Sequence, residues 1–597
     1  MCGITGFLSF DNKSIETDIL KKMTECLVHR GPDASGLYVE DNVAFGHRRL
    51  KIIDLSDNAN QPIFNDKKNI CVVYNGEIYN YLSIKKILQK KNYKFKTNTD
   101  TEILVHGFEE FGEKLFGKLN GMFSFAIFDK TKSKVYLVRD RFGIKPLYYR
   151  TEKHSLLFAS EIKSLALDFN NMTTTLNLDS ISSYFTNSYI AGRGTIYSEI
   201  HSLAPSHFLK IDLKAGKYEE KRFYNLETSV SNSVIKEDLD SLLSKSVESR
   251  MMSDVPVGAF LSGGLDSSAI VYNMKKYNDN LNTYSMGFGD GEPNELNHAR
   301  TVSDFIGTNH NELFVESNKL LNNIDDIVHY MDEPSGDGGF IPTYFLSKFA
   351  KRDVSVALSG EGADEVFCGY KKFKVLRYRP LFPKSKYIYN KFKWAPELSG
   401  RLISALSAPK DIDAYNQMTK FMPPKKVSDF ISNKNLSRMS NFQLLDIRKR
   451  MSDSFLMKVD RMSMAHSLEV RVPFLDHNIV EYGLKLRTKD KINFFTEKYN
   501  LKKAMKNKLP KRIINRPKRG FSVPINMWLK EGIVDDLLDN HNSYQNNFVP
   551  SDYFNKAVKK IKSSSSDYYS NYFYSSFLWS YFIFDKWIDK NKPNMKK

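Results

Sequence analysis

A glycine turn between an apolar strand and a helix constrains this chain more than any other feature. In VPVGAFLSGGLDSSAIVYNMKKY (255–277), the buried run VGAFL leads into SGGLDSS (262–268), and a helical pattern follows. Two glycines and small hydroxyl residues let backbone N–H groups and the start of the helix approach an oxyanion closely. The lysine and the spacing of the G-x-x-x-x-G-K-[ST] loop are absent. The stretch therefore predicts a phosphate site of another type, and the alternative is a purely structural turn.

Strand and helix patterns alternate after this turn. NTYSMGFGD (282–290) and DVSVALSGEGADE (353–365) are two further strands that end in glycine-rich turns, and the pattern from about 370 to 597 is mostly helical. Such alternation is typical of βαβ units and a parallel sheet. We therefore expect an α/β parallel-sheet domain with a mostly helical C-terminal part over residues 235–597, behind a linker at about 215–235.

The first part of the chain has a different texture. GMFSFAIFDK (121–130) and KVYLVRDRFG (134–143) are two strands joined by a polar turn, a hairpin pattern. ICVVYNGEIYNY (70–81) predicts a strand that runs into a turn at Asn75-Gly76. Successive hairpins favour antiparallel sheets, so we expect an α+β domain over residues 1–215.

Composition bounds the partners and the compartment. The 597 residues carry 88 basic and 69 acidic side chains, a net charge of +19 that could attract nucleic acid. The lysines are dispersed, however, without a basic arm or zinc-finger spacing, so we expect no nucleic-acid partner. The four cysteines include no C-x-x-C pair, which favours a reducing compartment. No signal-peptide pattern is present, and the run FLWSYFIF (577–584) is far shorter than the ~20 residues that span a bilayer. We expect a cytoplasmic enzyme without a membrane partner.

A second turn brings carboxylates together. LSGEGADE (358–365) contains Glu361, Asp364 and Glu365, and so dense an acidic turn is costly unless cations lie nearby. Mg²⁺ and a basic residue would supply them. Lys518, in the basic turn RPKRGFSVP (516–524), could stabilise charge on a departing phosphate group. The alternative is a solvated acidic loop.

The second residue is a cysteine, in MCGITGF (1–7). Removal of Met1 would leave Cys2 with both a thiol and a free α-amine, whose ordinary pKa of about 8 suits it to accept the thiol proton. A nucleophile and its base would then lie on one residue. Taken alone, an N-terminal cysteine is better explained by chance, and the motifs that accompany it change that judgement.

Five motifs accompany Cys2: HRGPD (29–33), GHRRL (46–50), YNGEIYN (74–80), TDTE (99–102) and RDRFGIKPLYY (139–149). With Cys2, the set resembles the class II glutamine amidotransferase domain, an N-terminal-nucleophile fold built as a sandwich of antiparallel sheets with helices. The resemblance implies that the Cys2 thiolate attacks the side-chain amide of glutamine and releases ammonia. It also implies roles for further residues: Asn75 and Gly76 in the oxyanion hole, Arg49 on the glutamine α-carboxylate, and Glu77 and Asp100 on its α-amine. His29, Arg30 and Asp33 would shape the pocket without taking part in catalysis.

SGGLDSS resembles the pyrophosphate loop of the ATP pyrophosphatase superfamily. With LEVRVPFLDH (468–477) and the closing FLWSYFIFDKW (577–587), the two parts together resemble the glutamine-hydrolysing asparagine synthetase family. The resemblance covers about 1–530 and the last helix, and leaves about 535–570 unassigned. It implies a ligase that converts aspartate and ATP into β-aspartyl-AMP and pyrophosphate. Ammonia from glutamine, carried through an internal tunnel, would then displace AMP and give asparagine.

The same resemblance implies the residues of the adenylating site. The pyrophosphate loop would comprise Ser262, Gly263, Gly264, Asp266, Ser267 and Ser268. Contacts with the nucleotide would come from Leu261, Met286, Ser359 and Gly360, and Lys518 would lie on the phosphates. Asp266 and Asp364 would hold Mg²⁺, and Glu361 would be needed for the adenylate and for the attack by ammonia. ATP as co-substrate, Mg²⁺ and a homodimer complete the expectation.

Three alternatives remain at this stage. An amidotransferase acting on a sugar uronic acid, in surface-polysaccharide biosynthesis, would use the same catalytic motifs, and no residue decides between the two acceptors. A basic nucleic-acid-binding protein with a degenerate enzyme fold would bind DNA or RNA in a salt-sensitive way. A β-lactam-forming cyclase would share the two-domain fold but would lack the N-terminal cysteine that this chain keeps.

Overall fold

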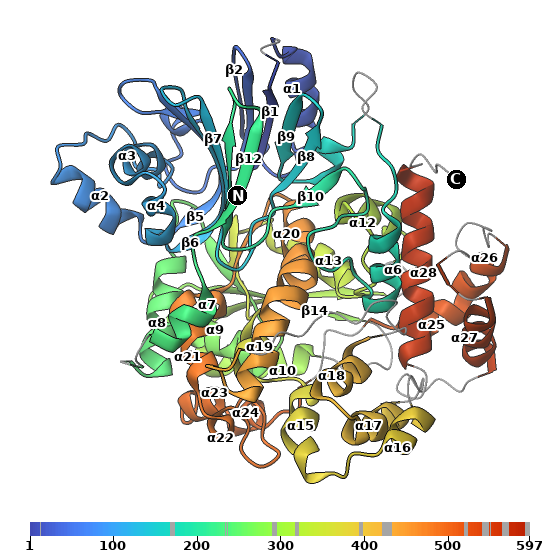
Figure 1. Cartoon of the computed structure of the whole chain (residues 1–597). Helices are drawn as coiled ribbons and strands as arrows, with labels where there is room; N and C mark the ends of the chain where they lie inside the picture. Colours follow the sequence, from blue (N-terminus) through green and yellow to red (C-terminus); the bar gives the residue numbers. More distant parts are fainter. Residues whose placement is uncertain are drawn as a thin grey trace.

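Two antiparallel sheets form the first part of the molecule (Figure 1). The computed structural model describes every residue except 12–13, 168–172, 233–234, 236, 289–294, 317–320, 393–397, 421–432, 519–522, 540–547, 550, 564–571 and 592–597. One sheet, in the order β10-β8-β9-β1-β3-β2, consists of β1 (Gly3–Ser9), β2 (Ala34–Glu40), β3 (Val43–Arg49), β8 (Tyr148–Glu152), β9 (Ser155–Ala159) and β10 (Ile200–Ser202). The other, in the order β12-β11-β7-β6-β5-β4, consists of β4 (Ile63–Phe64), β5 (Ile70–Ile78), β6 (Gly121–Asp129), β7 (Lys134–Arg139), β11 (His207–Asp212) and β12 (Lys217–Arg222).

Apolar side chains that alternate along these strands explain why the two sheets face each other. Ile4 and Phe45 from one sheet and Val73, Ala126 and Leu137 from the other belong to a single buried cluster. Helix α1 (Thr17–Glu25) covers the outer face of the first sheet, and α2 (Tyr81–Gln89) and α3 (Glu102–Phe111) cover that of the second (Figure 1). The expected α+β sandwich is therefore confirmed, with helices on both outer faces.

The predicted hairpin is confirmed, because β6 and β7 pair in antiparallel register. The predicted turn at Asn75-Gly76 is wrong. Strand β5 runs on to Ile78, and Gly76 lies directly opposite Phe123 of β6. A Cβ at position 76 would lie 2.1 Å from the carbonyl oxygen of Met122. The glycine thus permits a close approach of two strands rather than a reversal of the chain.

A five-stranded parallel sheet organises the second part. Its order is β15-β14-β13-β16-β17, with β13 (Val257–Phe260), β14 (Asn282–Phe288), β15 (Asn309–Val315), β16 (Val356–Leu358) and β17 (Glu469–Arg471). Helix α9 (Leu265–Lys275) follows β13 directly, as predicted. From β13 the chain adds β14 and β15 on one side of the sheet and then β16 and β17 on the other. Ligands of α/β folds bind at the carboxyl ends of the two strands that flank such a switch in strand order, here β13 and β16. SGGLDSS and SGEGADE both begin there. Strand β17 is not predicted, because three residues are too few for a strand period to show.

Helices make up the rest of the second part, as expected. They include α7 (Leu226–Asn232), α8 (Leu239–Arg250), α10 (Leu296–Ile306), α12 (Ile324–Met331), α13 (Phe340–Ala350), α14 (Ala363–Phe367), α15 (Lys371–Tyr378), α16 (Lys386–Phe392), α17 (Leu398–Ser407), α18 (Asp411–Thr419), α19 (Arg438–Asp446), α20 (Leu456–Met464), α21 (His477–Lys485), α22 (Thr488–Lys491), α23 (Tyr499–Ala504), α24 (Lys511–Ile514), α25 (Ile525–Trp528) and α26 (Val534–Asp539). A π-helical stretch, Ile447–Phe455, joins α19 to α20.

The last helix ties the two parts together. Helix α28 (Tyr572–Asn591) packs along α6 (Leu178–Asn187) of the first part (Figure 1), and the Tyr184 hydroxyl donates to the carbonyl oxygen of Ser580 at 2.6 Å. Helix α27 (Ser551–Ser563), in the stretch that the sequence left unassigned, packs against α28. Within the described residues, no helix is both long and apolar enough to cross a bilayer.

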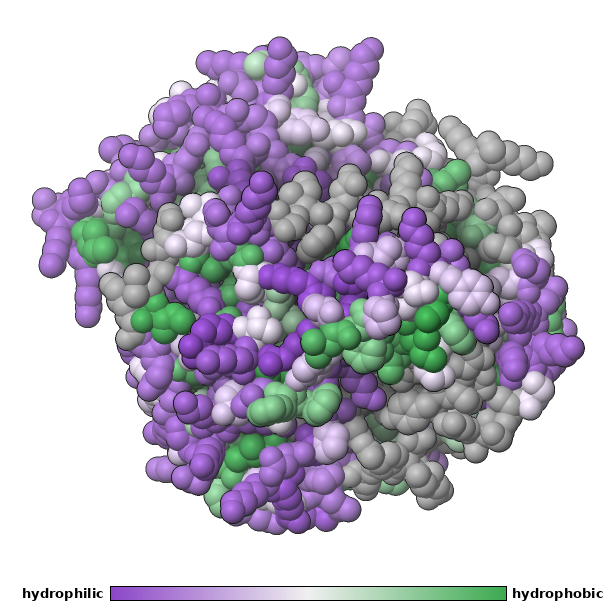
Figure 2. Space-filling model, turned by 60° about the horizontal axis from the view of Figure 1, so that its bottom comes forward, coloured by the Kyte–Doolittle hydropathy of each residue, from purple (hydrophilic) through white to green (hydrophobic). Residues whose placement is uncertain are grey.

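The face at the bottom of Figure 1 is brought forward in Figure 2. Hydrophobic residues gather there at several separate places among hydrophilic ones. Leu381, Tyr387, Phe494 and Phe495 are large exposed apolar side chains of the segments around α15, α16 and α22, which lie toward that side. The expected homodimer stays a prediction.

Candidate active sites

Cys2 precedes β1 and lies against β5. Its backbone N–H donates to Asn75 Oδ1 at 3.0 Å, and both residues are buried. Burial raises the pKa of the Cys2 thiol, while the positive N-terminal amine, a Leu50 backbone hydrogen bond and Arg49 act in the opposite direction. The structure thus brings the predicted nucleophile next to a predicted oxyanion residue, 73 positions along the chain.

The residues predicted to hold the glutamine α-amine lie in the same part of the fold. Asp100 Oδ2 accepts from the Tyr74 hydroxyl at 2.7 Å and from the Ile78 N–H at 2.8 Å. Burial raises the pKa of both the Glu77 and the Asp100 carboxyl groups. Glu77 Oε1 is buried and has no hydrogen-bond partner among the residues that the structure describes. A buried acceptor of this kind is costly unless a ligand satisfies it.

Arg49, predicted to grip the α-carboxylate, is engaged by its own loop. Its Nη1 donates to the Ser56 carbonyl oxygen and to Asn60 Oδ1, both at 2.7 Å, and its Nη2 contacts the Ile53 and Asp54 carbonyl oxygens. A carboxylate would have to replace at least one of these contacts. The structure therefore places Arg49 in the site, but the N–H groups of its guanidinium already bind oxygens of the 53–60 loop.

Two residues of the second part complete this site, and sequence reasoning missed both. The Met1 amine donates to Glu469 Oε2 at 2.7 Å, Arg471 Nε to Glu469 Oε1 at 2.7 Å, and Arg471 Nη2 to Glu77 Oε2 at 3.1 Å. Burial works to raise the pKa of Glu469, but the N-terminal amine and Arg471 together lower it to about 2. Glu469 and Arg471 are two positions apart on β17 and share a face. This pair of opposite charges inside the apolar run of LEVRVPFLDH is the signal that could have found them.

The predicted phosphate turn lies at the N-terminus of α9. Gly263 has a φ of 64°, and a Cβ there would lie 2.3 Å from a backbone carbon of α10, so the position needs glycine. The hydroxyl oxygens of Ser262 and Ser267 are 3.1 Å apart. A Cβ on Gly360 would lie 2.8 Å from the Ser267 nitrogen. The two glycine turns, from β13 and β16, are therefore in direct contact.

Opposite charges lie in front of this turn. Lys498 Nζ is 2.5 Å from both Asp266 Oδ2 and Asp364 Oδ1, and Lys518 Nζ is 2.5 Å from Asp364 Oδ2. Burial alone would raise the pKa of Asp364, but Lys498 and Lys518 hold it well below its usual range. Asp266 and Asp364 thus meet, as predicted for a shared cation site. Lys498 was missed, because nothing distinguishes it within the lysine-rich TEKYNLKK (496–503).

One cavity of about 1310 Å³ opens in front of both turns, larger than the roughly 300–1,000 Å³ of most ligand pockets. Ten predicted residues line it: Leu261, Ser262, Asp266, Ser267, Met286, Ser359, Gly360, Glu361, Asp364 and Lys518. Gly263, Gly264 and Ser268 lie behind this lining. Glu361 Oε1 is 3.5 Å from Lys458 Nζ of α20. The first part also contributes, through Asn187, Ser188 and Tyr189.

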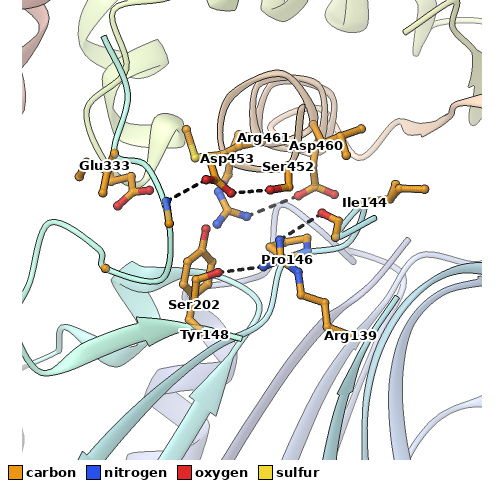
Figure 3. A pocket seen from close by; sticks show the side chains of 16 residues that line it. Arg139, Ile144, Pro146, Tyr148, Ser202, Glu333, Ser452, Asp453, Asp460 and Arg461 are labelled. Carbon is orange, nitrogen blue, oxygen red and sulfur yellow. Dashed lines mark hydrogen bonds and ion pairs between the residues drawn. The ribbon is translucent and has the colours of Figure 1, made fainter. Parts of the chain in front are cut away.

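A buried polar seam adjoins both sites, and Figure 3 shows its centre. Side chains of α20 and the π-helix, among them Asp453, Asp460 and Arg461, face Arg139 and Tyr148 of the first part. The space that they enclose is about 20 Å³, which is room for about one water molecule, or one ammonia of similar size.

Ion pairs cross this seam and reach the Cys2 region. Arg30 Nη1 donates to Asp460 Oδ2 and to Glu161 Oε1, both at 2.8 Å, and Arg30 Nε donates to the Cys2 carbonyl oxygen at 3.1 Å. His29 Nε2 is 3.1 Å from Glu161 Oε1. Asp33 accepts from the Lys51 backbone N–H at 2.8 Å, outside this network. His29 and Arg30 thus have structural partners, as expected for residues that shape a pocket.

Glu333, which lines the same small space, makes the free energy of unfolding depend on pH. Burial and then Asp332 raise its pKa from 4.5 to about 8, and Ile196 N–H donates to its Oε2 at 3.2 Å. The folded state keeps the proton up to about pH 8, whereas the unfolded chain releases it near 4.5. Protonated Glu333 therefore makes its full contribution to the stability of the folded state below about pH 4.5, and that contribution is lost as the pH rises toward 8.

We expect Glu333→Gln to raise Tm at pH 8 by a few degrees and to leave it nearly unchanged at pH 5, in thermal unfolding scans. An equal effect at both values would contradict this.

Comparisons with known proteins agree with the two-part geometry. A family model described as a glutamine amidotransferase domain matches residues 1–224, and one described as asparagine synthase matches residues 238–589. A curated relative, "Asparagine synthetase [glutamine-hydrolyzing] 1" of Bacillus subtilis, is 34% identical over 561 residues, which are 89% of this chain and 88% of the relative. The chain belongs to the glutamine-hydrolysing asparagine synthetase family.

Other members of the asparagine synthetase family show the same likeness. "Putative asparagine synthetase [glutamine-hydrolyzing] 2" of Methanocaldococcus jannaschii is 37% identical over 396 residues, 62% of this chain and 76% of that relative. Membership makes the chain a glutamine-dependent carbon–nitrogen ligase that uses ATP and a carboxylate acceptor. The antiparallel sandwich of the first part is accordingly of the N-terminal-nucleophile type, and the parallel sheet of the second lies within the asparagine synthase match.

Proposed function

We propose that the protein makes asparagine, by hydrolysing glutamine at Cys2 and using the ammonia to amidate aspartate at the second site. The observation that carries this proposal is the cavity lined by the SGGLDSS turn, Glu361, Asp266 and Asp364, with Lys498 between the two aspartates. The acceptor, aspartate, is proposed on the names of the relatives, which cover nearly the whole chain. A uronate acceptor would use the same cluster, but the two relatives described above are named for asparagine synthesis.

At the first site, loss of Met1 would expose the Cys2 α-amine, which would accept the thiol proton. The thiolate would attack the glutamine amide carbon, with the Asn75 side-chain amide and the Gly76 N–H on the oxyanion. The unsatisfied Glu77 Oε1 supports a role for this carboxylate in holding the α-amine. Ammonia would leave, and water would release glutamate from the thioester.

At the second site, the hydroxyls of Ser262 and Ser267 and the start of α9 would hold pyrophosphate. Lys498 and Lys518 would offset the charge that develops as it leaves. The aspartate side-chain carboxylate would attack the α-phosphorus of ATP, giving β-aspartyl-AMP and pyrophosphate. Ammonia would then displace AMP beside Glu361, with Lys458 as the cation nearest to that carboxylate.

Asp266 and Asp364 fit a Mg²⁺ ion, which the relatives do not by themselves establish. Both carboxylates already lie on one cationic centre, Lys498 Nζ, and Asp266 Oδ1 is buried without a hydrogen-bond partner in the described part of the chain. No cluster of three or more metal-binding side chains was found there. Two carboxylates are sufficient, since Mg²⁺ takes further oxygens from phosphates and water. The ion would supply charge neutralisation for the phosphates.

The test is product formation by the purified protein. With glutamine, ATP and MgCl₂, we expect AMP, pyrophosphate and asparagine to form only when aspartate is added, and to form in equal amounts. Galacturonate and glucuronate serve as parallel acceptors in the same assay. Amide formation on a hexuronate, with no AMP above background in the aspartate reaction, would overturn the asparagine assignment while leaving the ligase chemistry intact.

A further inference from the structure

Arg450 stands out among the cations of the large cavity, because it is half-buried and Asp446, the acidic group that acts on it, is paired with Lys372 instead. It lines the cavity and is half-buried, yet it makes no hydrogen bond or ion pair with any residue that the structure describes. Four lysines of the lining are paired with carboxylates: Lys372 with Asp446, Lys374 with Glu497, Lys458 with Glu361, and Lys518 with Asp364. An unpaired guanidinium in a partly desolvated site is costly unless an anion joins it.

Two aromatic rings hold this guanidinium in place. Arg450 Cζ lies 5.0 Å from the Phe455 ring centroid and 5.9 Å from that of Tyr370. Contacts with ring faces fix the position of the group but leave N–H donors at its edge unused. The Tyr370 hydroxyl is itself committed to Glu365 Oε1, at 2.6 Å. The side chain is thus positioned, while its hydrogen-bonding capacity stays available.

The backbone under Arg450 is also unusual. It belongs to the π-helical stretch Ile447–Phe455, between α19 and α20. Stretches of this kind are rare, are less well bonded than an α-helix and occur frequently at functional sites. Ser454, Phe455 and Lys458 follow Arg450 along the same wall of the cavity. The π-helix therefore sets Arg450 on the wall that leads to Glu361.

Phe455 links the position of Arg450 to that of Glu361, beside which the acceptor carboxylate would react. Lys458 Nζ lies 5.1 Å from the Phe455 ring centroid and 3.5 Å from Glu361 Oε1. Phe455 therefore lies between the free guanidinium and the Lys458–Glu361 pair. A small dicarboxylate with one end beside Glu361 would extend along Phe455 toward Arg450.

We propose that Arg450 binds the anionic group of the acceptor that does not react, which for aspartate is the α-carboxylate. A guanidinium group donates two parallel hydrogen bonds to a carboxylate, and the two aromatic rings already hold this group in place. This inference rests on the proposed function and deepens it. Arg450 would be the residue that distinguishes an amino-acid acceptor from a carboxylate without a second charge.

The test compares Arg450→Gln and Arg450→Lys with the wild type in aspartate-dependent AMP formation. We expect Gln to raise KM for aspartate about 10- to 100-fold, the usual effect of losing a charge-assisted hydrogen bond, and Lys to have a smaller effect. KM for ATP and for glutamine should stay within about twofold. Arg448→Gln is the matched control, since Arg448 is on the same π-helix but is exposed and pairs with Glu227. It should behave like the wild type.

A second experiment removes the α-carboxylate of the substrate instead of the Arg450 side chain. In isoasparagine, the α-amide of aspartate, the reacting carboxylate is kept and the α-carboxylate is neutral. The wild type should prefer aspartate to isoasparagine about 10- to 100-fold in kcat/KM, and Arg450→Gln should lose most of that preference. Glutamine hydrolysis, measured on the same samples, reports that each variant is folded.

The outcomes separate the two claims. If the wild type makes AMP with aspartate but Arg450→Gln keeps the wild-type KM and the wild-type preference, the role of Arg450 is refuted and the proposed function stands. A wild type that does not discriminate against isoasparagine refutes it without any variant. If aspartate supports no AMP formation at all, the proposed function fails and this inference fails with it.

Discussion

Cys2→Ala is expected to lose glutamine hydrolysis, by at least about a thousandfold, and to keep ammonia-driven synthesis. Alanine removes the thiol but preserves the backbone N–H that donates to Asn75 Oδ1, so the local fold should persist. The large cavity is lined mainly by the second part of the chain and does not include Cys2. The measurements are glutamate release from glutamine, and AMP formation with ammonium chloride in place of glutamine.

Cys71→Ala is the matched control for this variant. Cys71 is another buried cysteine, near the start of β5, and burial raises the pKa of its thiol. It should keep both activities. An extra residue left in front of Cys2 should act like Cys2→Ala, since it blocks the α-amine that the mechanism uses as base. Glutamine hydrolysis by Cys2→Ala at a rate near that of the wild type would sink the assignment of the nucleophile.

Lys498→Met is expected to reduce AMP formation by about a hundredfold or more, whether glutamine or ammonia supplies the nitrogen. The change removes the cation that lies 2.5 Å from both Asp266 and Asp364 and replaces it with an apolar side chain of similar length. Two buried carboxylates then lose their common partner, which typically costs about 3–5 kcal/mol. We therefore also expect a lower Tm.

Glutamine hydrolysis by the same sample shows whether Lys498→Met has folded, because the first site does not contain Lys498. Lys503→Met, on the exposed side of α23, is the matched control and should leave both activities unchanged. AMP formation by Lys498→Met at the wild-type rate, in a sample that hydrolyses glutamine, would remove Lys498 from the proposed mechanism.

Sequence patterns predicted correctly the strands and helices whose formation depends mainly on neighbouring residues. An apolar strand, a glycine turn and a helix start follow one another within SGGLDSS and its flanks, and the structure places β13 and α9 accordingly. Asn75-Gly76 shows the limit of such signals. The dipeptide is a common turn former, but its pairing with β6 along the whole length of β5 overrides that preference.

Residues that act through distant contacts could not be predicted in this way. Arg471 meets Glu77 across 394 positions of sequence, and Lys498 meets Asp266 across 232. Nothing local to TEKYNLKK marks one lysine as buried, because the pairing is created only when the sheet and α23 are assembled. Arg450 belongs to the same class, since its contact with Tyr370 and its place in the cavity arise only in the folded chain.

The ion pair between Glu77 and Arg471 has a consequence for the order of synthesis. A ribosome makes the whole first part before it reaches β17, so the nascent glutaminase half carries Glu77 without its counter-ion. Glu469, the partner of the chain's amino terminus, arrives at the same late moment. The charges that pair with Glu77 and with the amino terminus are therefore made at the same time as the last strand of the second part's sheet. A fragment that ends before residue 469 lacks both Glu469 and Arg471.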